Sequence, residues 1–191
     1  MKKFLTMKHW QLFALLIGIP MILQIIGMSA MIGYEDPTTM LLFFPVMMII
    51  CCAVFFGWFY ALGTNLHSKL PDIVSMSLTK FKVFLIIPIV YLILIPGVLF
   101  SVFAESSSGD ELSFAIVPVV LILHLFSMFC IFYCLYFIAK ALKAVEWQRT
   151  VTFSDFAGEF FLIWFFPVGI WIIQPRINKL FEIAVAEHDA N

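Results

Sequence analysis

Long apolar stretches alternate with short charged segments along this chain. No Asp, Glu, Lys or Arg occurs in four stretches, at residues 10–33, 37–66, 83–104 and 112–139. Each is long enough for a helix to cross the hydrocarbon core of a bilayer, which takes roughly 20 residues. The pattern predicts an all-α, polytopic integral membrane protein, and short connections favour an antiparallel bundle in a single membrane domain over residues 1–191. The predicted transmembrane helices cover about residues 10–33, 40–63, 83–103 and 114–139.

The charged segments between these stretches alternate in sign. All eleven basic residues lie before the first stretch, between the second and the third, or after the fourth. The other two connections contain five of the twelve acidic residues and no basic residue. By the positive-inside rule, this asymmetry predicts that both termini are cytoplasmic. The cytoplasmic side is then net positive, which favours contact with anionic lipid headgroups.

The composition also indicates a bilayer environment. Hydrophobic residues make up 63% of the chain and charged residues only 12%, more apolar surface than a soluble domain of this size can hide. The basic residues are few and lie at membrane level, so we expect no nucleic-acid partner. The chain starts with the basic and apolar pattern of a secretory signal. Its long apolar run and the poor cleavage site at Met28, Ser29 and Ala30 predict an uncleaved first helix instead.

The C-terminal third contains an apolar segment that is too short to cross a membrane. As a helix, residues 160–173 would reach about 21 Å. A crossing would also place Arg176 and Lys179 on the outer side, against the charge bias. Pro167 removes a helix hydrogen bond near the centre of the run, which favours a bend. We therefore predict a re-entrant or interfacial segment over residues 153–173.

Helix signals flank this segment on both sides. Thr152 and Asp155 have the spacing of an N-cap residue and its capping box, which predicts a helix start. Pro175 is suited to the first turn of a second helix, which we expect over residues 175–188. Its predicted apolar stripe consists of Ile177, Leu180, Phe181 and Ala184.

Aromatic and basic residues of this region form a candidate surface for lipid or for a partner. Trp164 and Trp171 are seven residues apart, share one face of a continuous helix, and suit the headgroup level of a bilayer. The surface would serve a membrane protein partner or a homo-oligomer, or would only anchor the segment in the lipid bilayer. The candidate residues are Trp164, Phe165, Phe166, Trp171, Arg176 and Lys179.

Small residues and prolines inside the spans allow two further hypotheses. Ala53, Gly57 and Ala61 form a stripe at intervals of four, which lets another helix approach closely. That helix belongs either to the same bundle or to a second copy. Prolines in the outer halves of the spans could splay the helices into an outward-facing crevice, but prolines are also common in membrane helices. They are Pro45, Pro96 and Pro118.

One ionisable side chain, His124, lies inside a predicted span. Such residues are candidates for function, but transport would require a second group at the same depth. Gln24 and Tyr91 are the plausible partners, and neither is ionised at neutral pH. We therefore favour a structural role for His124. The four cysteines also lie within spans, where buried Cys behaves as a small hydrophobe, so no disulfide or metal site is expected.

A polar cluster is predicted at the inner surface. His67, Asp155 and Glu159 could form a carboxylate–histidine metal site or an acid–base pair. Stabilisation of a helix N-terminus is the favoured explanation for Asp155 and Glu159, because no sequence motif with a recognised mechanism joins the three. The remaining members of the cluster are Asn65, Asp72 and Glu146.

Three classes of function are compatible with these patterns. The favoured class is a small non-enzymatic subunit that binds a partner or lipid at the inner face, with no catalytic residue and no cofactor. The second is a small outward-facing channel or transporter, which would need oligomers because four helices enclose little space. The third is a lipid-modifying enzyme that uses the cluster of His67, Asp155 and Glu159.

Overall fold

The computed structural model describes residues 3–34, 37–106 and 112–189. Within these ranges the protein is 88% helical and contains no β-strand, which confirms the predicted all-α class. Four of the acidic residues expected on the outer side, Glu35, Asp36, Asp110 and Glu111, lie outside the described residues.

Four helices within the described ranges are long and apolar enough to cross a membrane, as predicted. The last three are α4 (Pro37–His67), α5 (Leu78–Ser106) and α6 (Leu112–Trp147). Both α5 and α6 extend past the uncharged stretches by more than a turn at their Lys-containing ends. Lys is a good helix former, and its long side chain can keep the charge in water while the stem covers apolar surface.

The first candidate span, His9–Ser29, is not one regular helix. A short α1 (Lys3–Thr6) precedes α2 (His9–Phe13), a π-helical turn follows at Ala14–Gly18, and α3 (Ile19–Tyr34) completes the span. Pro20 explains the irregular turn, because proline has no N–H and its ring conflicts with the carbonyl four residues earlier. The wider turn lets the Ile19 N–H donate to the Ala14 carbonyl, five residues back.

The C-terminal region differs from the prediction in its helix boundaries. The chain forms α7 (Phe153–Trp164) and α8 (Phe166–Asp189), so α8 does not begin at Pro175 but continues through it. The break falls at Phe165, whose carbonyl accepts hydrogen bonds from the N–H groups of Val168 and Gly169. Pro167 then lies in the first turn of α8, where a missing N–H has no cost.

Burial explains why α8 runs through its internal proline. Ile170 and Ile173 before Pro175 and Ile177 after it are all fully buried. Their spacing places them on one face of a helix, so ending the helix at Pro175 would expose apolar surface on one side of it. Packing outweighs the local preference of proline here.

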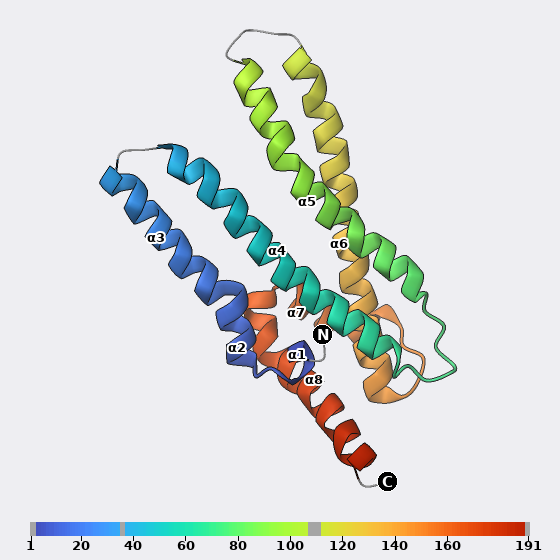
Figure 1. Cartoon of the computed structure of the whole chain (residues 1–191). Coiled ribbons are helices and arrows are strands. Elements are labelled where there is room, and N and C mark those ends of the chain that lie inside the picture. Colours follow the sequence, from blue (N-terminus) through green and yellow to red (C-terminus); the bar gives the residue numbers. More distant parts are fainter. Residues whose placement is uncertain (1–2, 35–36, 107–111, 190–191) are drawn as a thin grey trace.

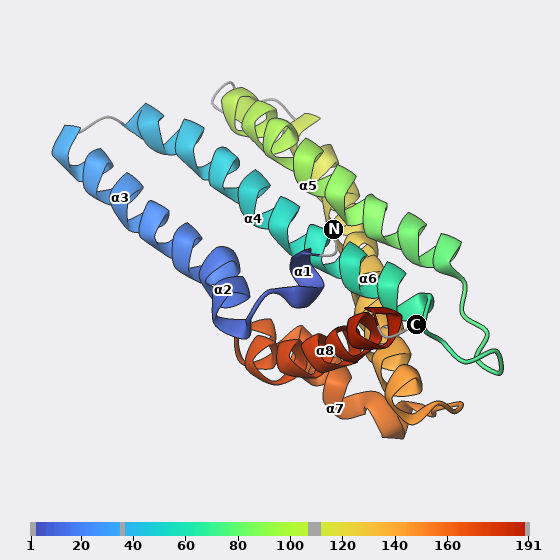
Figure 2. The ribbon, with the colours of Figure 1, turned by 60° about the horizontal axis from the view of Figure 1, so that its bottom comes forward.

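Contacts between helices are unevenly distributed (Figures 1 and 2). α3 packs on α4, α4 contacts both α5 and α6, and α5 pairs with α6. α7 packs on α6, while α8 packs on α7, α1 and α2. We call the end of the molecule that holds α1, α7, α8 and the adjoining ends of the long helices the packed end. At the opposite end, the distal end, α3 and α4 diverge from α5 and α6 in Figure 1.

The largest fully buried side chains belong to helices that meet at the packed end. They are Trp58, Phe59, Phe81, Phe137 and Phe156. Phe81 lies so close to Gly63 that any Cβ at that position would overlap its ring. By contrast, only 11% of the residues are buried in the most apolar 18-residue stretch of the first candidate span, and the same holds for the fourth. The hydrophobic core therefore lies at one end of the molecule rather than along the length of the spans.

Candidate functional site

A buried ionic network joins three helices at the packed end. The guanidinium of Arg176 on α8 donates to Glu146 on α6 (Nε to Oε1, 2.8 Å) and to Glu159 on α7 (Nη2 to Oε1, 2.8 Å). Lys143 Nζ lies 2.8 Å from the same Glu159 oxygen. The Glu159 side chain is only 7% exposed. The network therefore ties α6, α7 and α8 together by charge-assisted hydrogen bonds.

The network keeps its buried carboxylate ionised. Burial alone would raise the pKa of Glu159, but hydrogen bonds from Lys143 and Arg176 outweigh it and lower that pKa. In turn, the hydrogen bond to Glu146 raises the pKa of the Arg176 guanidinium above its ordinary value. A carboxylate held in this way is a poor general acid or base near neutral pH, because it takes up a proton only in acid.

His67 and Asp155 are engaged elsewhere. The His67 Nε2 atom lies 2.8 Å from the Met76 carbonyl oxygen, and its ring stacks near Phe137. Asp155 accepts hydrogen bonds from both the backbone N–H and the hydroxyl of Thr152, at 2.8 and 2.9 Å. These bonds are the predicted capping of α7, and they lower the pKa of Asp155.

The predicted grouping of His67, Asp155 and Glu159 is therefore wrong. Each has its own partners, and no group of three or more His, Cys, Asp or Glu that could hold a metal occurs among the described residues. Asn65 donates to the Ala61 carbonyl, and Asp72 is exposed on the connection between α4 and α5. His67 lies on α4, whereas Asp155 and Glu159 lie on α7, which packs on α6 and α8.

Gln174 is a buried polar residue that sequence reasoning missed. Its Oε1 accepts a hydrogen bond from the Trp58 indole at 3.2 Å, and its Nε2 donates to the Phe4 and Met7 carbonyls. The side chain is fully buried. It links α8, α4 and the N-terminal segment. Its amide supplies hydrogen bonds to backbone carbonyl groups at the end of the short helix α1, where helix carbonyls lack partners within the helix. The available signal was an amide within an otherwise apolar run, beside Pro175.

His124 has the partner that the sequence allowed. Its Nδ1 atom lies 3.1 Å from the Tyr91 hydroxyl, between α6 and α5. His124 is exposed on the surface of the helix pair, and Tyr91 is half-buried. The bond satisfies one polar atom of each residue inside the apolar spans, which is the arrangement expected of a structural histidine.

The four aromatic residues of the predicted partner surface do not form one continuous face. Trp164 packs edge-on against Phe132 of α6, whereas Trp171 contacts Phe13 and His9 of α2. The break at Phe165 separates them, and Phe165 itself is 63% exposed. Phe166 turns inward toward Phe55 on α4. Two tryptophans seven residues apart share a face only if the helix between them is continuous.

The basic residues of that predicted surface also have different surroundings. Arg176 belongs to the ionic network, where it forms ion pairs with Glu146 and Glu159. Lys179, three residues later, is exposed. Of the two, Lys179 is therefore the better placed for an external anionic group.

The small-residue stripe on α4 packs partly within the molecule. An added Cβ at Gly57 would lie 3.5 Å from the Phe4 ring, so this glycine faces the N-terminal segment. Ala61 is fully buried, while Ala53 is exposed. The stripe thus lets α1 approach α4 along part of its length.

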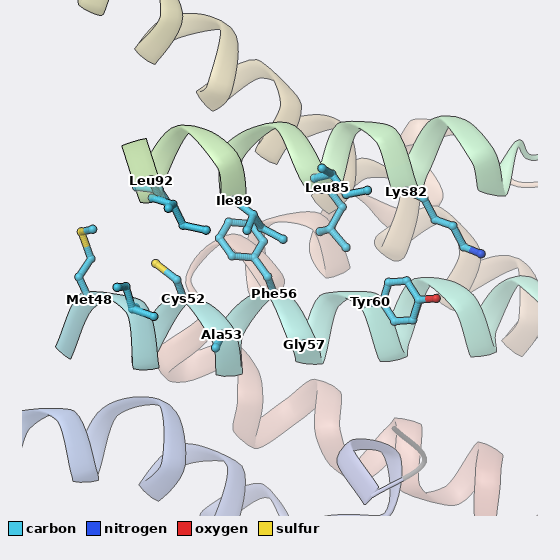
Figure 3. A pocket seen from close by; sticks show the side chains of 13 residues that line it. Met48, Cys52, Ala53, Phe56, Gly57, Tyr60, Lys82, Leu85, Ile89 and Leu92 are labelled. Atoms are coloured by element: carbon cyan, nitrogen blue, oxygen red, sulfur yellow. The ribbon is translucent and has the colours of Figure 1, made fainter. Parts of the chain in front are cut away.

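An apolar groove lies between α4 and α5 (Figure 3), and sequence reasoning did not foresee it. Its volume is about 480 Å³. Met48, Cys52 and Phe56 line it from α4, and Leu85, Ile89 and Leu92 line it from α5. The Tyr60 hydroxyl and the Lys82 ammonium lie together at one end. The groove is therefore amphipathic along its axis, with its polar end toward the start of α5.

Four apolar helices of spanning length are compatible with a membrane protein. Comparison with known proteins found no matching family, no matching curated sequence and no matching solved structure. Any more specific function therefore has to be argued from the residues and their arrangement.

Proposed function

We propose that the chain is a non-enzymatic, multi-pass membrane protein that binds lipid, or a partner protein, at the inner face of the membrane. One observation carries the proposal: polar groups at the packed end are engaged with one another, whereas the spans are mostly unburied. In this proposal the four spans form an antiparallel bundle in one membrane domain, and both termini are cytoplasmic.

The exposed surface of the spans supports contact with hydrocarbon. Large apolar side chains there are more than half exposed, among them Ile22, Ile93, Leu94, Ile122 and Leu125. In water each would weaken folding by leaving apolar area unburied. In a bilayer the lipid tails are as apolar as these side chains, so the same surface is stable and can accept lipids or helices.

The packed end supplies the features suited to the inner interface. Phe165 and Val168 are each 63% exposed at the α7–α8 joint, with Trp164 and Trp171 on either side of it. Trp and Lys are favoured at the membrane–water boundary. Exposed Lys179 could pair there with anionic headgroups. We propose this joint as the interfacial anchor of the protein.

Labelling of single cysteines tests the orientation. In a background without native Cys, Ser107→Cys should react with an impermeant thiol reagent on intact cells, and Ser68→Cys should not. The expectation rests on the basic residues flanking the α4–α5 connection and their absence from the connection that contains Ser107. The opposite labelling pattern would overturn the orientation.

Native mass spectrometry of the purified protein tests the binding role. We expect peaks at the protein mass plus whole numbers of lipid molecules, or plus a stoichiometric partner. Incubation with those lipids should leave their masses unchanged, since no catalytic site is proposed. Recovery of bare protein only, or conversion of the lipid, would contradict the proposal.

The hydrogen-bonded pair of His124 and Tyr91 supports a second candidate, a small oligomeric channel or transporter. A polar pair of exposed His124 and half-buried Tyr91 on two spans could line a path between copies of the chain. Ion or proton flux into protein-containing liposomes would favour this candidate. Its loss in a folded His124→Gln variant would assign the path to this pair.

A further inference from the structure

We infer that the α4–α5 groove holds one anionic phospholipid of the cytoplasmic leaflet, with an acyl chain along the groove and the phosphate at Lys82. The inference rests on the proposed lipid-binding function and names the class of lipid and its site. It depends on the length, the volume and the charge of the groove.

The length of the groove matches one leaflet. Along α5 the lining runs from Lys82 to Ile93, which is about 16 Å at the rise of an α-helix. Half of the hydrocarbon core of a bilayer is about 15 Å. A chain lying in the groove would therefore start at the interface and end near the bilayer midplane, as an acyl chain does.

The volume of the groove, about 480 Å³, suits a small molecule or a lipid chain. The volume falls within the range of about 300–1,000 Å³ that is typical of small-molecule sites.

The charge at the end of the groove selects the headgroup. Lys82 Nζ lies 5.9 Å from the centre of the Tyr60 ring, at the outer limit of a cation–π contact. No carboxylate among the described side chains forms a salt bridge with Lys82. The ammonium and the Tyr60 hydroxyl are together available to a phosphate, and the ammonium favours a headgroup with a net negative charge.

Two lipids with identical acyl chains test the headgroup preference. The full-length protein in detergent is titrated with phosphatidylglycerol or with phosphatidylcholine, and binding is measured by native mass spectrometry. We expect phosphatidylglycerol to bind about five-fold more tightly, in line with one basic residue near a charged lipid surface. Lys82→Gln should remove that preference. The matched control is Lys80→Gln, which lies on the same turn but outside the groove and should retain it.

A second pair of variants tests the acyl-chain path. Cys52 lines the groove and its neighbour Cys51 does not. Cys52→Phe should weaken the binding of both lipids about ten-fold, as expected if the ring displaces about two methylene groups. Cys51→Phe should leave both affinities within about two-fold of the wild type. Circular dichroism and size-exclusion chromatography check folding. If Cys52→Phe fails to fold, the comparison of Lys82→Gln with Lys80→Gln tests the inference.

The outcomes separate this inference from the proposed function. Retained lipid with equal affinity for both headgroups, or equal effects of Lys82→Gln and Lys80→Gln, overturns the groove assignment and leaves lipid binding elsewhere intact. A dimer that is lost in Cys52→Phe while lipid binding persists would assign this face to a second copy. Absence of retained lipid would overturn the groove assignment, and absence of both lipid and a stoichiometric partner from every form of the protein would overturn the proposed function itself.

Discussion

The packed end and the distal end of this molecule are built from the same kinds of apolar residue, yet they are organised differently. At the packed end, Trp58, Phe81 and Phe137 are completely buried, and the polar groups among them are paired. Toward the distal end, Ile93 and Leu94 are about 60% exposed, and the helix pairs diverge. The contrast shows that apolar composition alone does not draw these helices together.

In the proposed membrane placement, the surroundings of the two ends differ. Burying apolar surface stabilises the fold most where water reaches it, as at the proposed inner interface. Within hydrocarbon that driving force is absent, and helices associate only through close packing and hydrogen bonds. We therefore expect substitutions at the packed end to cost stability and comparable substitutions along the spans to cost little.

A methyl group added at Gly169 should have the largest effect. Its Cβ would overlap the backbone carbonyl of Leu162, which cannot move aside without shifting α7. We expect Gly169→Ala to destabilise the protein by about 4 kcal/mol. Thermal unfolding in detergent measures the change.

The controls for this substitution are two glycines with open space around them, Gly158 in α7 and Gly97 in α5. Alanine at either position should be neutral or stabilising by up to about 1 kcal/mol through helix propensity. A Gly169→Ala protein as stable as these controls would show that α7 and α8 are not in close contact.

Removal of the central cation of the ionic network should have the next largest effect. Arg176→Met leaves Glu146 and Glu159 without their shared partner, and Glu159 is almost completely buried. Breaking a buried ion pair costs about 3–5 kcal/mol, and the partial exposure of Arg176 places the expected loss near about 3 kcal/mol. Lys179→Met, on the exposed side of the same helix, should change stability by less than about 0.5 kcal/mol. Equal losses in unfolding experiments would contradict the role of the network.

The same network predicts acid sensitivity. The pKa of folded Glu159 is below its ordinary value of 4.5 because the hydrogen bonds from Lys143 and Arg176 outweigh the effect of burial. A depressed pKa contributes stability above pH 4.5, and that contribution is lost as the pH falls through the folded value. Melting temperatures measured from pH 7 to pH 3 should fall less steeply for Glu159→Gln than for the wild type. Asp155 leaves a residual decline in the variant, since its pKa is also lowered. Parallel curves would exclude Glu159 as the source.

The smallest effect is expected within the spans. His124→Leu removes the hydrogen bond to Tyr91, and such bonds between membrane helices contribute about 0.6 kcal/mol on average. Tyr91→Phe is the matched variant and should have a similar effect on melting temperature. A loss of several kcal/mol from either substitution would show that the distal helices depend on this bond, and the contrast between the two ends would fail.

Properties that depend on local sequence were predictable in this chain. Uncharged stretches of sufficient length predicted four helices that could span a membrane, and the described residues contain four such helices. The capping box at Thr152 and Asp155 was also predictable, because its partners are three residues apart. Length, hydropathy and capping are set by neighbours along the chain.

Only the tertiary structure decided which distant groups meet. Arg176 was expected at a lipid surface, but its partners are Glu146 and Glu159, on two other helices. Gln174 bonds to Trp58 and Phe4, each more than 100 residues away, and the groove beside Lys82 exists because α4 and α5 adjoin there. Helix period and hydropathy determine which face of a helix is apolar. They do not determine which other face covers it, because that depends on the packing of all the helices at once.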